Sequence, residues 1–287
     1  MNPPVLASNR SVAKDPLPEP GTQSGSALGA PDSQAAVAAE DLKAAIRAQY
    51  ARAATGTGCC GPASASGVSS CGGDTGTARR PASTAAQEAD LGLGCGHPTA
   101  LGEIAPGSVV LDLGSGAGVD CFLAAEAVGP EGRVIGVDMT PEMVARARRH
   151  AASAGLGNVE FRLGEIEHVP LADGAVDVVL SNCVINLAPD KRVVFDEIRR
   201  VLRPGGRAYL SDISLTAPLP EAIRNDPEAV ASCIGGAILV DDYQTLVRQA
   251  GFELERFEIR GGDADGECCS GSGALPLVSV DIVARKP

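Results

Sequence analysis

Cysteines are the residues of this chain whose types and settings best suit chemistry. Three of them stand in short motifs that lie far apart along the sequence. The motifs are Gly94-Cys95-Gly96-His97-Pro98, Ser181-Asn182-Cys183-Val184-Ile185-Asn186-Leu187 and Ser232-Cys233-Ile234-Gly235-Gly236. Soft thiolates select soft, thiophilic centres. If the three loops converge, three sulfur atoms could hold one such centre.

The elements that must position these cysteines follow from an alternation of apolar strands and helices that begins near residue 107. We predict strands over 108–113, 133–137, 158–163, 176–181 and 206–213, and helices over 117–128, 140–154 and 189–202. A helix near 241–250 and an antiparallel hairpin of strands near 252–260 and 277–285 follow. This order predicts an α/β fold, a mostly parallel sheet with helices on both faces. Cys183 follows the fourth strand, at the edge where such sheets bind ligands.

A glycine-rich loop joins the first predicted strand to the first helix. Its candidate cofactor residues are Gly114, Ser115, Gly116 and Gly118. Glycines let the backbone approach a ligand closely, and a helix N-terminus offers N–H groups to an anion. Dinucleotide enzymes use a related loop, but Val119 replaces the last glycine of their pattern, and Asp112 at the loop's mouth would repel a pyrophosphate. A carboxylate there suits an ammonium group, so the loop favours S-adenosylmethionine.

Acidic residues after the next two strands complete the predicted cofactor site. Asp138 closes the second strand about 20 residues beyond the loop, where a carboxylate can accept both ribose hydroxyls. Capping of the following helix is the alternative role for Asp138. Glu165 and Ile166 follow the third strand, and we expect them at the edge and face of the adenine. Met139 and Asn182 are assigned to the same site.

The stretch from residue 107 to 213, which ends in Val201-Leu202-Arg203-Pro204-Gly205-Gly206 and the fifth strand, resembles the class I S-adenosylmethionine-dependent methyltransferases. The resemblance implies a Rossmann-like fold with a seven-stranded sheet whose last strand is reversed. The predicted C-terminal hairpin agrees with this expectation.

Groups that could remove a proton from an oxygen or nitrogen acceptor are few. The chain has three histidines, and His150 shares a basic helix face with Arg146 and Arg149, where we expect it to be solvated. Trivalent arsenic held by three sulfurs keeps a lone pair that can attack a sulfonium methyl without a base. The cysteines therefore favour arsenic as the methyl acceptor.

The segments that contain Cys95, Cys183 and Cys233 closely resemble the bacterial arsenite methyltransferases, over roughly residues 41 to 287. The resemblance implies that arsenite and then methylarsenite are converted to methylated arsenicals, with reduced thioredoxin or glutathione as the reductant. Because the part after the fifth strand is shorter than in the longer family members, the number of methylations stays open.

The other cysteines lie in low-complexity segments. In the family, an N-terminal cysteine near a Cys-Cys pair takes part in a disulfide relay, which matches Cys59 or Cys60 here. Cys71 has no assigned counterpart, and Cys268 and Cys269 lie in the connection of the C-terminal hairpin. An unstructured linker with inert cysteines is the alternative for residues 54–86.

Composition suggests three parts. We predict a disordered tail over 1–34, an N-terminal helix (35–53) and cysteine-bearing arm within 35–106, and the methyltransferase domain over 107–287, with an acceptor-site insertion at about 214–250. The net charge of −12 argues against a nucleic-acid partner. No apolar run suits a membrane span and no secretion signal is evident, so we expect a cytoplasmic protein, where cysteines stay reduced.

Other functions fit parts of the pattern. The cysteines could be small buried apolar residues of a methyltransferase that acts on carbon or oxygen, or they could form a zinc site, although they lack the close Cys-x-x-Cys pairing of structural zinc sites. A non-catalytic protein that sequesters or senses arsenite is the remaining alternative.

Overall fold

The computed structural model describes residues 33–56, 84–224, 226–260 and 275–287. Seven strands form one sheet in the order β3-β2-β1-β4-β5-β7-β6. Strands β1 to β5 pair in parallel, and β7 runs antiparallel to both β5 and β6. The Rossmann-like sheet with one reversed strand, which the sequence predicted, is therefore confirmed. The strands are β1 (Val109–Leu113), β2 (Arg133–Asp138), β3 (Val159–Leu163), β4 (Val176–Asn182), β5 (Leu202–Leu215), β6 (Glu253–Arg260) and β7 (Leu277–Arg285).

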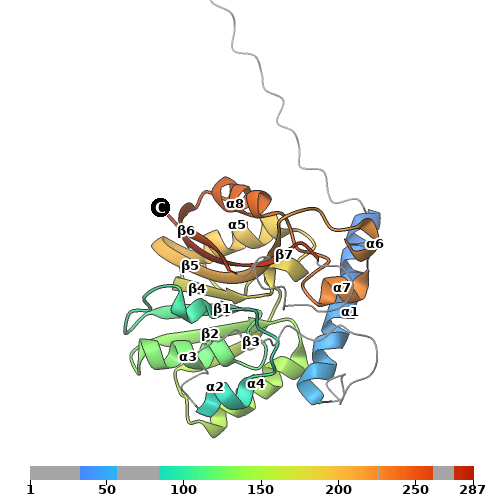
Figure 1. The fold of residues 1–287 in the computed structure, drawn as a ribbon. Helices are drawn as coiled ribbons and strands as arrows, with labels where there is room; N and C mark the ends of the chain where they lie inside the picture. Colours follow the sequence, from blue (N-terminus) through green and yellow to red (C-terminus); the bar gives the residue numbers. More distant parts are fainter. Residues whose placement is uncertain (1–32, 57–83, 225, 261–274) are drawn as a thin grey trace, which may run out of the picture.

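Helices cover both faces of the sheet (Figure 1). One face packs against α5 and α8, whose apolar side chains join the largest buried cluster. The other face packs against α2, α3 and α4. The helices are α1 (Ser33–Thr55), α2 (Thr84–Ala89), α3 (Val119–Val128), α4 (Pro141–Ser153), α5 (Lys191–Val201), α6 (Glu221–Arg224), α7 (Pro227–Ala231) and α8 (Val240–Gln249), with 3-10 turns η1 (Pro98–Ala100) and η2 (Ile185–Leu187).

Local sequence signals account for the helix starts. Thr140 is the N-cap of α4 and Pro141 its first residue, as predicted, and the Asp190 side chain caps α5 by accepting the Arg192 N–H. Helix α3 begins at Val119, later than the predicted residue 117, because Gly118 has a left-handed φ of 102° and still belongs to the loop. The six-residue α2 was not predicted, since so short a helix leaves little periodic pattern.

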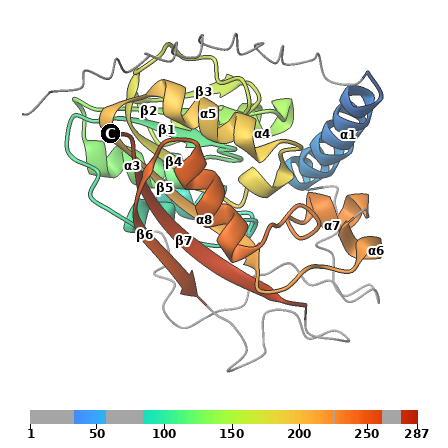
Figure 2. The same ribbon diagram turned by 90° about the horizontal axis from the view of Figure 1, so that it is seen from above.

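The first helix lies at one end of the sheet, beside α4 and α7 (Figures 1 and 2). It extends the helix predicted over 35–53. Ile46 on α1 is fully buried in a cluster that includes Cys183 and Cys233. None of the described helices combines the length and apolar character needed to cross a membrane.

Helix α5 provides a test of the packing. Phe195 is fully buried and meets Tyr243 and Phe252 edge to face, with ring centroids 6.0 and 6.4 Å away, whereas Val193 on the same helix is 36% exposed. Phe195→Ala should lower the free energy of unfolding by about 3–5 kcal/mol, because it removes buried apolar surface and leaves a cavity. Val193→Ala, the matched control, should change it by less than about 1 kcal/mol. Urea unfolding checks both values, and equal effects would contradict this packing.

Candidate active site

The glycine loop between β1 and α3 has the backbone geometry that a close ligand requires. Gly114, Gly116 and Gly118 all have left-handed φ angles, of 64°, 51° and 102°. A Cβ on Gly114 would lie 2.4 Å from a methyl carbon of Val184, so a side chain does not fit there. The Ser115 hydroxyl is buried and has no hydrogen-bond partner among the described residues. Such a buried polar group calls for a partner, which a bound ligand can supply.

Asp138 is held between the glycine loop and the start of α4. Its two carboxylate oxygens accept the Gly116 N–H at 2.9 Å and the Thr140 N–H at 2.8 Å. Burial raises the pKa of Asp138, and these two hydrogen bonds oppose the rise. Asp138 is thus not the N-cap of α4, and its orientation is fixed beside the loop.

Two more buried carboxylates lie behind the loop. Asp112 accepts a hydrogen bond from the Cys121 thiol at 3.2 Å, and Asp120 accepts one from the Asn182 amide at 3.0 Å. Burial, reinforced by the charge of Asp120, raises the pKa of Asp112, and burial raises that of Asp120 to about 6 although Asn182 and His97 lower it. Sequence reasoning missed Asp120, because an acidic residue in the first turn of a helix is ordinarily explained by its favourable interaction with the helix dipole.

These buried acids define the kind of ligand that the site accepts. None of Asp112, Asp120 and Asp138 forms an ion pair with a lysine or arginine in the part of the chain that the structure describes. Carboxylates buried without a counter-ion are costly unless a cation joins them. A ligand with an ammonium and a sulfonium group satisfies this requirement, so these residues and the unpartnered Ser115 hydroxyl fit S-adenosylmethionine.

Helix α1 closes the side of the site where the adenine is expected. Lys43 places its Nζ 2.6 Å from Glu165 and 3.0 Å from Glu167, and Arg47 lies 3.5 Å from Glu165. Ile166, the next residue after Glu165, is buried. The role of Glu165 and Ile166 at the adenine stays a prediction. No local pattern predicts that α1 pairs with Glu165, because the two are more than 100 residues apart.

The three predicted acceptor cysteines meet in one cluster, and Met139 from the cofactor side packs against it. Cys95 and Cys183 form a disulfide, with their Cα atoms 6.0 Å apart. The Cys233 thiol donates to the Cys183 carbonyl oxygen at 2.7 Å. The expectation of three thiolates is corrected in one respect, since two of the sulfurs are oxidised here. Their loops bring them close enough to bond to each other.

Backbone conformation sets Cys183 and Cys233 apart from their neighbours. They are the two non-glycine residues with positive φ among those the structure describes, at 55° and 64°. This region is costly for side chains with a Cβ, and such strain tends to gather at functional sites. Tyr50 of α1 contacts Cys233, and burial, together with the interaction with the Cys233 sulfur, raises the pKa of the tyrosine.

Asp212 lies beside the predicted acceptor cysteines, and sequence reasoning missed it. One of its carboxylate oxygens and the sulfurs of Cys95 and Cys183 all lie within 4.8 Å of one another. Asp212 accepts hydrogen bonds from the Ile213 N–H, the Asn186 amide and the Tyr243 hydroxyl at 2.8–3.1 Å. Burial raises its pKa to about 7, although the Ile213 N–H, the Tyr243 hydroxyl and the charge of Lys191 lower it. The signal that could have found Asp212 is an acid inside an apolar strand. That strand, β5, pairs with β4, which leads into Cys183.

The structure tests the expectation for His150 but not those for the cysteines of the low-complexity segments. His150 was expected to be solvated, but its side chain is only 19% exposed and lies 4.0 Å from Glu88 of the unpredicted α2, so that expectation was wrong. The relay candidates Cys59 and Cys60, together with Cys71, Cys268 and Cys269, lie outside the described residues.

The Rossmann-like sheet, the glycine loop at the end of β1 and the acid at the end of β2 together define a class I S-adenosylmethionine-dependent methyltransferase. Residues 104–251 match the family described as a methyltransferase domain. Since this match spans half of the chain, the protein belongs to that family.

Relatives with high sequence identity share one description. The chain is 55% identical over 207 residues to an arsenite methyltransferase of Halobacterium salinarum, which covers 70% of this chain and 52% of the relative. It is 47% identical over 153 residues to an arsenite methyltransferase of Aquipseudomonas alcaligenes, covering 51% of this chain and 44% of the relative. The chain therefore spans about half the length of the curated relatives it matches.

A solved structure with a similar fold carries a similar description. The crystal structure of an arsenic (III) S-adenosylmethionine methyltransferase from Chlamydomonas reinhardtii matches 66% of this chain and 66% of its own, with a TM-score of 0.56 and 37% sequence identity.

The buried acids predict how cofactor binding depends on pH. Because the pKa of Asp120 is raised to about 6, this carboxyl gains a proton as the pH falls through that value, and its attraction for a cation is lost. Affinity for S-adenosylmethionine should therefore fall by up to about tenfold per pH unit below that point. Titration calorimetry between about pH 8 and about pH 5 measures it. Asp120→Asn should flatten the curve, and an unchanged slope in this variant would exclude Asp120 as the group responsible.

Proposed function

We propose that this protein is an arsenite methyltransferase, which transfers the methyl group of S-adenosylmethionine to trivalent arsenic bound by cysteine sulfur. One observation carries the proposal: Cys95, Cys183 and Cys233 come together from three separate segments, with Cys183 directly after the strand that borders the glycine loop. The arsenite methyltransferases among its relatives support the choice of acceptor.

The chemistry needs little from the protein beyond sulfur ligands and orientation. Arsenite exchanges hydroxide for thiolate, and each released hydroxide leaves as water with the proton of the incoming thiol. Arsenic held by sulfur keeps a lone pair for the new As–C bond, so no base has to remove a proton from it. S-adenosylmethionine supplies an electrophilic methyl group when it is bound. The task of Asp112 and Asp138 is to hold that cofactor, with Glu165, Ile166 and Met139 along its adenosine side.

A reductant follows from the disulfide. Opening the bond between Cys95 and Cys183 takes two electrons and two protons, which one dithiol or two molecules of a monothiol can supply. Methyl transfer from a sulfonium also formally oxidises arsenic. We therefore propose reduced thioredoxin or glutathione as a partner, with Cys59 or Cys60 as the relay cysteine that the family resemblance implies.

Thiols that must bind arsenic have to stay reduced between turnovers, and this requirement supports a cytoplasmic location for the enzyme as part of the proposal. Its substrates are arsenite and methylarsenite. Because the net charge is −12, we do not propose a nucleic-acid partner.

The activity has a direct test. Purified protein with S-adenosylmethionine should form S-adenosylhomocysteine and methylated arsenic only when arsenite and a thiol are both present, because the acceptor is a thiol-bound arsenical. Chromatography coupled to arsenic-specific mass detection measures the products. Arsenite binding without S-adenosylhomocysteine would instead identify a sequestering protein, and turnover of an oxygen or carbon acceptor without arsenic would identify a different methyltransferase.

Cysteine variants test the acceptor site. Cys183→Ser and Cys233→Ser should each abolish arsenite methylation, since a hydroxyl is a poor ligand for a soft centre. Cys268→Ser is the matched control and should keep activity near that of the wild type. Product formation rates at saturating S-adenosylmethionine check this expectation. Activity that survives either of the first two substitutions would remove the arsenic site described above.

A further inference from the structure

The side chain of Asn182 connects the acceptor cysteines to the wall of the cofactor site. Its Oδ1 accepts the Cys95 N–H at 3.1 Å, and its Nδ2 donates to the Gly96 carbonyl at 2.9 Å. The same Nδ2 donates to the Asp120 carboxylate at 3.0 Å. Asn182 is also the last residue of β4, directly before Cys183. One amide therefore fixes the backbone on both sides of Cys95 and lies next to Cys183 in the chain.

The segment around Cys95 packs closely on this amide. A Cβ on Gly94 would lie 2.9 Å from Asn182 Nδ2, and one on Gly96 would lie 2.4 Å from the Ser211 Cβ. Ser211 pairs with Asn182 across the sheet, and its carbonyl accepts the Cys183 N–H at 2.9 Å. The two glycines thus let the Cys95 segment lie directly on the ends of β4 and β5.

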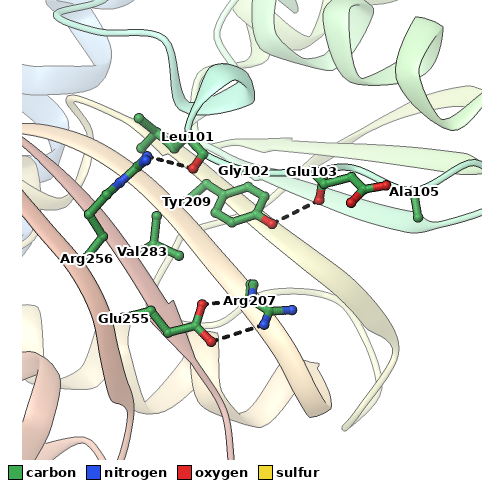
Figure 3. A pocket seen from close by; sticks show the side chains of 9 residues that line it. All are labelled: Leu101, Gly102, Glu103, Ala105, Arg207, Tyr209, Glu255, Arg256 and Val283. Carbon is green, nitrogen blue, oxygen red and sulfur yellow. Dashed lines mark hydrogen bonds and ion pairs between the residues drawn. The ribbon is translucent and has the colours of Figure 1, made fainter.

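The other end of this segment has its own anchor. A cavity of about 530 Å³ lies over β5, β6 and β7, and Figure 3 shows the residues that line it. There the Tyr209 hydroxyl donates to the Glu103 carbonyl at 2.9 Å, and Arg256 donates to the Leu101 carbonyl at 2.6 Å. In the same cavity Arg207 pairs with Glu255. These contacts hold residues 101–103 on the sheet, independently of Asn182.

We propose that Asn182 is a positioning residue that holds Cys95 against Cys183, and so sets how readily the two sulfurs act as a pair. From the sequence we predicted that Asn182 binds the cofactor, but its side-chain amide forms hydrogen bonds with the Cys95 segment and with Asp120. An amide that lowers the mobility of one thiol near another raises their effective concentration. The role in arsenic binding rests on the proposed function, whereas the role in pairing the two sulfurs does not.

The pairing can be measured without arsenic. Oxidised glutathione takes two electrons from the protein dithiol, so that the Cys95–Cys183 disulfide and two molecules of reduced glutathione form. Differential alkylation followed by peptide mass spectrometry reports this disulfide separately from the other seven cysteines. Asn182→Ala should lower the equilibrium constant for its formation by roughly tenfold, since two hydrogen bonds to the Cys95 segment are lost. At a pH of about 8, well above the pKa of about 6 of Asp120, that carboxylate keeps its charge, so affinity for S-adenosylmethionine should change by less than about twofold, which also shows that the variant is folded.

Two further variants separate positioning from a general loss of structure. Tyr209→Phe removes one hydrogen bond from the far end of the same segment and should leave the equilibrium constant within about twofold of the wild type. Gly94→Ala places a methyl group against the Asn182 amide and should lower the constant in the wild-type background. In the Asn182→Ala background the same methyl should have no further effect, because the amide it displaces is gone.

Each outcome decides the proposal. An unchanged constant in Asn182→Ala, an equal fall in Tyr209→Phe, or additive effects of Gly94→Ala and Asn182→Ala would overturn it. A fall in S-adenosylmethionine affinity without a change in the constant would return Asn182 to the cofactor site. If the predicted pattern appears but no methylated arsenic forms, the positioning role stands and the proposed acceptor fails.

Discussion

The left-handed backbone at Cys183 is the constraint on which the acceptor site depends. Strand β4 would otherwise continue past Asn182, and its next side chain would follow the alternation of the strand. The positive φ at Cys183 ends the strand, so that its sulfur meets Cys95 while its carbonyl receives the Cys233 thiol. This left-handed conformation costs free energy at Cys183. It persists because the surrounding packing and hydrogen bonds impose it.

Cofactor and acceptor sites share one edge of the sheet because parallel strands present their carboxyl ends together. Asp112 is the last residue but one of β1 and Asp138 the last of β2, while Asn182 is the last of β4 and Asp212 lies near the carboxyl end of β5. The first pair belongs to a cluster of buried negative charge that suits a cationic ligand, and the second pair supports the sulfurs. Asp120 connects the two halves, since it lies behind the glycine loop and accepts a hydrogen bond from Asn182.

The cofactor half could be predicted because its signals are local. The glycine loop, the acid after β2 and the alternation of strands and helices each lie within a short stretch of sequence, and the sheet that they imply is the one observed. The acceptor half depends on contacts between distant segments. Asp212 stands out in the sequence as an acid inside an apolar strand, but that signal does not reveal its neighbours, and the contacts of α1 with Glu165 and Cys233 join positions more than 100 residues apart. Whether two cysteines can form a disulfide depends on their proximity in the fold, which spacing along the chain does not reveal.

We propose that sulfur atoms from separate loops hold a single arsenic atom. X-ray absorption at the arsenic K-edge, recorded on the fully reduced protein loaded with one equivalent of arsenite, measures this coordination directly. We predict a first shell made of sulfur, from which the Cys183→Ser variant loses sulfur and gains oxygen. A shell of oxygen alone in the wild-type protein, or an unchanged sulfur shell in that variant, would contradict it.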